Sequence, residues 1–124
     1  QDITVINARI QKLPFPKETF DISLCTETLE HAPDTEKCIN ELMRVLKKNG
    51  KLILTFPNEK NRKPLYPIAK LLGINTSVED KVTLFELDPD EIISFIVSAG
   101  GLIKKQYSFP WYFPLTHLIV AEKQ

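Results

Sequence analysis

Residues 20–58 constrain the fold more than any other part of the chain, because apolar and amphipathic segments follow one another there in a fixed order. Residues 20–25 form a short apolar run. Residues 34–48 carry apolar side chains at helical spacing, and the basic, glycine-ending stretch 47–50 predicts the end of that helix. Residues 52–56 are apolar, as in a strand buried on both faces. This order predicts a right-handed, parallel strand–helix–strand unit.

The carboxyl ends of these two strands are the expected ligand site, because open α/β sheets bind ligands there. The first strand is followed by the loop of residues 26–34, and the second by Asn58. His31 in the loop is a candidate general base or substrate contact, and its alternative role is to anchor the start of the next helix. Glu27 and Glu30 are placed to position a substrate hydroxyl or amine, and a solvated or structural role is the alternative.

Composition restricts the classes of function. The 124 residues suffice for one domain with a core, and sixteen basic residues balance sixteen acidic ones, which disfavours nucleic-acid binding. Cys25 and Cys38 lie on a predicted strand and on an apolar helix face, so we expect buried thiols and a cytoplasmic location. The longest apolar stretch, residues 92–103, is too short to span a membrane. With His31 and His117 as the two histidines, we expect no metal site.

Two further segments flank this unit. Residues 3–10 alternate weakly between apolar and polar side chains and predict a short strand. Residues 59–80 combine charges with prolines and predict a lid-like excursion on the ligand side of the sheet. Two interpretations stay open for the basic side chains of this lid, an anion-binding patch or a solvated charge run. These side chains are Lys60, Arg62, Lys63 and Lys70.

The C-terminal third predicts one helix and a hairpin. Asp88 and Pro89 are a typical cap and first residue of a helix. Residues 102–108 and 115–122 are two strand-like runs, and the short aromatic loop between them favours antiparallel pairing. We expect this loop either to pack on the sheet or to line an apolar substrate pocket.

Short motifs stand along the chain in a characteristic order. They are Leu13-Pro14-Phe15, Phe20-Asp21, Leu29-Glu30-His31, Arg44-Val45-Leu46-Lys47, Gly50 and Pro57-Asn58. Together they resemble the later half of a class I S-adenosylmethionine-dependent methyltransferase, of the small-molecule type called the type 11 methyltransferase domain. The resemblance implies one partial α/β domain over residues 1–124, a three-layer Rossmann-like methyltransferase fold. Its sheet would be mostly parallel, with an antiparallel C-terminal hairpin, and would lack the first two strands.

The resemblance also implies site residues for S-adenosylmethionine and for its methyl acceptor. The residues implied for the cofactor are Arg9, Ile10, Cys25, Thr26, Glu27 and Leu29. Those implied for the substrate are Glu30, Asn58 and Trp111, with His31 as the catalytic residue. Arg9 stands where the family often has an acidic residue near the adenine. The family's glycine-rich cofactor loop and acidic ribose clamp belong before Gln1 and are missing from this sequence.

We therefore expect a methyltransferase that acts on a small molecule, in a truncated form with impaired cofactor binding. The alternative is a non-catalytic methyltransferase-like remnant that serves as a binding or assembly module. The missing strands would leave an apolar sheet edge. Either the strand at residues 3–10 closes against the strand at residues 20–25, or a second copy covers the edge in a homodimer. Specificity would lie in the lid and in the aromatic loop.

Overall fold

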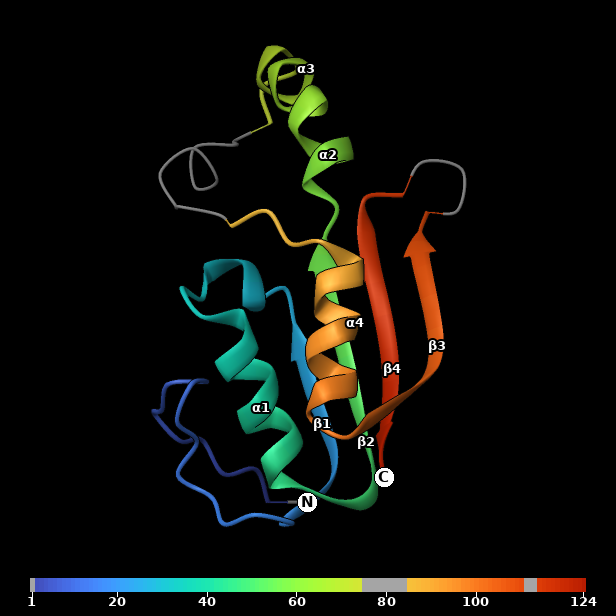
Figure 1. Cartoon of the computed structure of the whole chain (residues 1–124). Helices are drawn as coiled ribbons and strands as arrows, with labels where there is room; N and C mark the ends of the chain where they lie inside the picture. Colours follow the sequence, from blue (N-terminus) through green and yellow to red (C-terminus); the bar gives the residue numbers. More distant parts are fainter. Residues whose placement is uncertain (1, 75–84, 111–113) are drawn as a thin grey trace.

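The computed structural model describes residues 2–74, 85–110 and 114–124, which are built around one four-stranded sheet (Figure 1). The strands are β1 (Phe20–Thr26), β2 (Leu46–Pro57), β3 (Gly101–Phe109) and β4 (Thr116–Lys123). Their order across the sheet is β1-β2-β4-β3. β1 runs parallel to β2, whereas β4 runs antiparallel to both of its neighbours. The predicted parallel unit and the predicted hairpin are both confirmed.

Two amphipathic helices, α1 (Thr35–Val45) and α4 (Pro89–Ser98), cover one face of this sheet (Figure 1). Each begins at an aspartate whose side chain accepts a backbone hydrogen bond, Asp34 from Lys37 and Asp88 from Asp90, both at 2.9 Å. Such a cap stabilises a helix by about 1 kcal/mol. Shorter helical turns follow the carboxyl ends of β1 and β2. They are η1 (Leu29–His31), α2 (Glu59–Arg62), η2 (Lys63–Leu65) and α3 (Tyr66–Leu71).

The core lies between the two helices and the sheet. Leu52, Leu54 and Phe56 of β2 are fully buried and alternate with residues on the opposite face, as the two-residue period of a strand requires. Ile39 of α1 and Ile96 of α4 pack into the same cluster. Burying one such side chain contributes about 1.5–3 kcal/mol. This cluster fixes the sheet and thereby the position of the strand ends.

The predicted end of the first helix is wrong. α1 ends at Val45, and residues 47–50 form a bulge in β2, where the pairing with β1 jumps from Leu46 to Lys51. Asn49 supplies the left-handed residue of this bulge, with φ of 63°. A Cβ on Gly50 would lie 2.8 Å from the carbonyl oxygen of Lys47, so glycine is required by close backbone approach. The glycine therefore serves the strand and does not stop the helix.

The predicted strand at residues 3–10 is also wrong. In this segment the structure has only an isolated bridge between Arg9 and Lys12, and Ile3 and Val5 are 88% and 91% exposed. A weakly alternating run forms a strand only when a neighbouring strand accepts its hydrogen bonds. No such pairing with β1 occurs among the described residues, so the expected closure of this segment against residues 20–25 does not take place.

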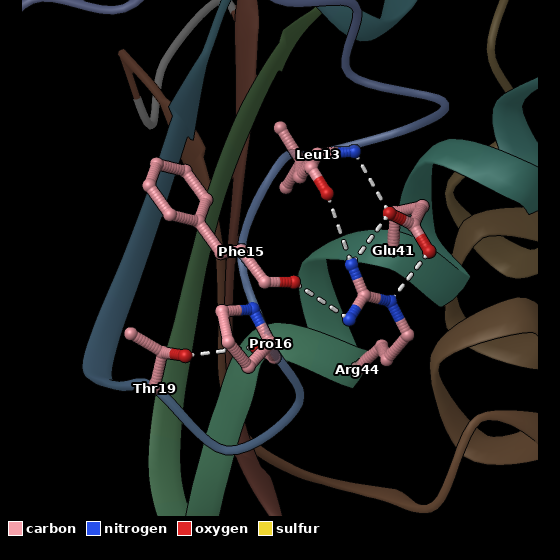
Figure 2. Close-up of polar contacts among 6 residues, drawn as sticks. All are labelled: Leu13, Phe15, Pro16, Thr19, Glu41 and Arg44. Atoms are coloured by element: carbon pink, nitrogen blue, oxygen red, sulfur yellow. Dashed lines mark hydrogen bonds and ion pairs between the residues drawn. The ribbon is translucent and has the colours of Figure 1, made fainter.

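The segment that follows is fastened to α1 by Arg44 (Figure 2). The guanidinium of Arg44 donates to the carbonyl oxygens of Phe15 at 2.9 Å and Leu13 at 3.2 Å. It also pairs with Glu41, whose carboxylate accepts from the backbone N–H of Leu13 at 2.8 Å. Phe15 meets the ring of Phe20 edge-on, with centroids 4.8 Å apart. These family motifs are thus structural, because they attach the N-terminal segment to α1 and to β1.

The opposite face of the sheet carries no helix in the part of the chain that the structure describes (Figure 1). Ile22 and Leu24 of β1 are 59% and 65% exposed. β1 also forms the edge of the sheet, so no described strand pairs with its outer side. The α/β class is confirmed, with a sheet that is mixed instead of mostly parallel. The described residues provide one helical layer where the three-layer expectation has two.

Candidate functional site

The candidate site is built on the adjacent carboxyl ends of β1 and β2. Thr26 pairs with Thr55, and the backbone N–H of Glu27 donates to the Thr55 carbonyl oxygen at 2.9 Å. Glu27 then adopts a left-handed conformation, with φ of 45°, which costs a residue with a side chain about 1–2 kcal/mol. The hydroxyl of Thr28 donates to the Thr26 carbonyl oxygen at 2.8 Å. This sharp turn leads the chain from β1 directly into η1.

A first cavity, of about 400 Å³, lies beside this turn. It is lined by Arg9, Ile10, Gln11, Thr28, His31, Ala32 and Pro33. Arg9 and Ile10, which were predicted for cofactor binding, therefore share one cavity with His31, the predicted catalytic residue. They meet because the turn closed by the Arg9–Lys12 bridge lies next to η1. Thr28 was not among the predicted site residues, although it stands in the same loop.

The other residues predicted for the cofactor lie around this cavity without being among its lining residues. Cys25 and Leu29 are buried in the core, 6% and 0% exposed. Burial raises the pKa of the Cys25 thiol, which favours a packing role over a reactive one. Thr26 is exposed at the strand end, and Glu27 forms an ion pair with Arg62 at 3.1 Å.

Glu30 is a buried carboxylate beneath this edge. It is 3% exposed, and its Oε2 has no hydrogen-bond partner among the described residues. Its Oε1 lies 3.8 Å from Nε2 of His31, whose side chain is 46% exposed. Burial is the main cause that raises the pKa of Glu30, and the charge of Glu27 adds to it. The backbone N–H of Phe85 donates to the Glu30 carbonyl oxygen at 2.8 Å, so Glu30 lies under the chain that leads to α4.

Arg62 in α2 is a positioning residue whose contacts the sequence did not predict. Its Nε donates to the carbonyl oxygen of Leu115 at 2.8 Å, and its Nη2 donates to the hydroxyl of Thr116 at 2.8 Å. The same nitrogen bonds Oε2 of Glu27. Arg62 therefore ties α2 to the ends of β1 and β4. Arg62 is therefore neither part of an anion-binding patch nor a solvated charge, because its guanidinium is hydrogen-bonded to Glu27, Leu115 and Thr116.

A second cavity, of about 180 Å³, lies on the other side of the β2 end. It is lined by Asn58, Glu59, Lys60, Glu86, Leu87, Pro89 and His117. Asn58, a predicted substrate residue, is thus placed here, whereas Glu30 is not among the residues lining either cavity. His117 reaches the cavity from β4, a position that no local sequence signal indicated. Trp111, the remaining predicted substrate residue, and residues 75–80 of the lid lie outside the described residues.

Within the described residues, no group of three or more histidine, cysteine, aspartate or glutamate side chains could hold a metal ion. Among these same residues, the structure contains no helix with the length and apolar character that a membrane crossing needs.

Comparison with known proteins finds a family whose sequences resemble the first part of the chain. Residues 1–54 match the model of the methyltransferase domain family. The predicted resemblance to S-adenosylmethionine-dependent methyltransferases is thereby confirmed. The match contains β1, η1, α1 and most of β2, so it includes the turn and the first cavity.

Several curated proteins are similar to this chain over part of their length. The uncharacterized protein MJ0638 of Methanocaldococcus jannaschii is 36% identical over 90 residues, which are 71% of this chain and 38% of that protein. The "Probable S-adenosylmethionine-dependent methyltransferase Rv3030" of Mycobacterium tuberculosis is 29% identical over 98 residues, 79% of this chain and 32% of that protein. The chain therefore spans less than half the length of these curated relatives.

A solved structure shows the same fold. Magnesium protoporphyrin IX methyltransferase from Synechocystis, crystallised with bound SAH, aligns with a TM-score of 0.68 at 17% identity. The alignment covers 96% of this chain and 50% of that one. The methyltransferase fold thus extends over nearly all of the chain, beyond the residues that match the family model.

Proposed function

We propose that this methyltransferase domain takes part in methyl transfer from S-adenosylmethionine to a small molecule. The observation that supports the proposal most directly is the first cavity, which brings Arg9, Ile10 and His31 together at the carboxyl end of a parallel strand. Ligands of open α/β sheets bind at that edge. The match of residues 1–54 to the methyltransferase domain family supports methyl transfer as the reaction at this edge.

The residues of the first cavity fit the adenosine end of S-adenosylmethionine. Ile10, Ala32 and Pro33 offer apolar walls to a planar base, while Thr28 and His31 offer polar groups beside them. When bound, S-adenosylmethionine supplies a methyl group on a positively charged sulfur that a nucleophile can attack. We propose that Thr26 and Glu27, at the strand end next to this cavity, lie along the cofactor.

We further propose that this chain by itself binds the cofactor weakly. No acidic side chain is among the described residues that line the first cavity, so a ribose would find no carboxylate there. Methyl transfer depends mainly on alignment of the donor with the acceptor. A loosely held cofactor would lower the rate for that reason. His31, half exposed on the same cavity, would serve as the base for the acceptor.

Calorimetric titration of the chain with S-adenosylmethionine and S-adenosylhomocysteine tests cofactor binding. We expect a dissociation constant in the range of about 0.1–1 mM, which corresponds to about 4–5.5 kcal/mol. The variant Ile10→Trp should abolish the heat by filling the cavity, and Ile68→Trp on the exposed side of α3 is the matched control. The absence of both heat and thermal shift at millimolar ligand would refute the proposal and favour a non-catalytic binding or assembly module.

For the quaternary structure, we propose a homodimer that covers the free edge of β1. The support is the position of β1 at the sheet edge, next to the exposed side chains of Ile22 and Leu24. Light scattering coupled to size exclusion should give the mass of a dimer, and Leu24→Lys should shift it toward a monomer. A monomeric wild-type chain at high concentration contradicts the proposal.

We also infer a cytoplasmic location from the two cysteines. Cys25 and Cys38 are both buried free thiols, and burial raises the pKa of Cys38 to about 11. Unreactive buried thiols are usual in reducing compartments. Cell fractionation, followed by detection of the chain with an antibody, checks this inference, and recovery from an oxidising compartment would oppose it.

A further inference from the structure

The second cavity contains a buried negative charge that is only partly paired. Glu59, the first residue of α2, lines the cavity and is 4% exposed. Its Oε2 accepts a hydrogen bond from the hydroxyl of Tyr66 at 3.2 Å. Its Oε1 has no hydrogen-bond partner among the described residues. A buried acceptor without a donor is costly, so a donor supplied by a ligand would be favoured here.

Among the charged side chains that line this cavity, Glu59 is buried, whereas Lys60 and Glu86 are exposed. Glu86 lies on the cavity wall and pairs with Lys63 at 3.2 Å, and both of these side chains are about half exposed. Lys60 also lines the cavity but is exposed, so its long side chain can keep the ammonium in water. Burial lowers the pKa of His117, which keeps this imidazole neutral at neutral pH.

His117 lines the cavity with a neutral imidazole ring that is held by two contacts. Its ring lies against Phe56, with centroids 5.2 Å apart, and its Nδ1 is hydrogen-bonded to the hydroxyl of Ser108 at 3.0 Å. Leu87 and Pro89 add apolar wall. A cavity of about 180 Å³ with these walls suits a ligand of a few carbon atoms and one charged end.

We propose that the second cavity binds the ammonium group of a small organic amine, with the Glu59 carboxylate as its charge partner. The proposal goes beyond the proposed methyl transfer, because it assigns a class of ligand to a cavity that shares no lining residue with the first cavity. The ammonium supplies hydrogen-bond donors to the Glu59 carboxylate and offsets its charge. The alkyl part of the amine lies against Leu87, Pro89 and the His117 ring.

Binding of propylamine and 1-propanol, followed by NMR of the chain without cofactor, tests the proposal. We expect propylamine, which is protonated at neutral pH, to shift the amide signals of Asn58 and His117 with saturation. The alcohol, which has nearly the same shape and no charge, should bind at least about tenfold more weakly, since a hydrogen bond from a charged donor is stronger than one from a neutral donor. Equal binding of the two compounds, or no saturable shift with propylamine, would overturn the proposal.

Two variants locate the binding partner. Glu59→Gln should weaken propylamine binding at least about tenfold, since it removes the charge. Glu91→Gln, in the exposed first turn of α4, should leave binding unchanged. Unaltered binding in Glu59→Gln would refute the assignment, and the amide spectrum of the variant shows whether it is folded. Because no cofactor is present, failure of S-adenosylmethionine binding and failure of amine binding are observed separately.

Discussion

The substitution Glu30→Gln tests the site at its most buried charge. Glu30 is 3% exposed and lies near the carboxyl ends of β1 and β2. Its Oε2 has no hydrogen-bond partner among the described residues. A buried acceptor in that state costs the folded chain about 1–3 kcal/mol. An amide has nearly the same shape and no charge at any pH. Glutamine leaves polar atoms in the same buried place but removes the buried charge, so we expect the variant to be more stable than the wild type at neutral pH, by on the order of 1 kcal/mol.

The pH dependence gives the sign of this effect. Burial raises the pKa of Glu30 in the folded chain above its ordinary value of 4.5. The folded state therefore holds this proton more tightly than the unfolded state does. The resulting stabilisation is fully present below pH 4.5 and is lost as the pH rises through the folded pKa. The advantage of the glutamine variant must accordingly be small in acid and grow toward neutral pH.

Urea unfolding of both chains at about pH 4 and about pH 7 measures the difference in unfolding free energy. Glu36→Gln, an exposed position in the first turn of α1, is the matched control and should show no comparable change between the two conditions. A Glu30→Gln variant whose stability relative to the wild type is the same at both pH values, or lower at neutral pH, would refute the reasoning.

Three further changes test the framework around the site. Gly101→Ala should destabilise the chain by about 1–3 kcal/mol in urea unfolding, because its Cβ would lie 2.5 Å from Cγ2 of Ile96, and an unchanged midpoint would contradict the packing described. Glu41→Gln should cost less than about 1 kcal/mol at neutral pH, because it weakens a hydrogen bond with Arg44 that lowers the Glu41 pKa and that water partly screens. This loss of unfolding free energy should disappear as the pH falls below 4.5 and through the pKa of Glu41 in the folded chain. A loss that is the same at every pH would exclude the ion pair as its cause. Arg62→Gln should speed hydrogen exchange of the α2 amides by about tenfold, and unchanged protection would show that Arg62 does not fasten the lid.

The local pattern of the chain determined its central unit. The apolar spacing of residues 34–45 and the apolar run 52–56 depend on periods that each element carries within itself. The caps at Asp34 and Asp88 are local too, since their partners lie two or three residues away. These features placed the carboxyl ends of β1 and β2, and the ordered motifs carried the resemblance to methyltransferases before any contact was known.

Other features depended on contacts that are distant in sequence. Gly50 has the same sequence context as a helix stop, and only its approach to the carbonyl oxygens of Lys47 and Asp21 shows that it belongs to the bulge of β2. Arg44 holds the carbonyl oxygens of Leu13 and Phe15 across 31 and 29 residues. The motif residues therefore carried the resemblance to methyltransferases, which is confirmed, while their role in fastening the N-terminal segment came from the packing.

The candidate site likewise depends partly on local sequence and partly on tertiary contacts. The sequence alone placed His31, Glu30 and Asn58 at the carboxyl ends of two strands, because those ends follow from the order of elements. Only the tertiary structure brought Arg9 into the cavity of His31, and His117 into the cavity of Asn58 and Glu59. A cavity is formed by side chains whose backbone positions are fixed by different strands and helices. Its shape and charge therefore depend on the packing of the whole sheet, which no local period encodes.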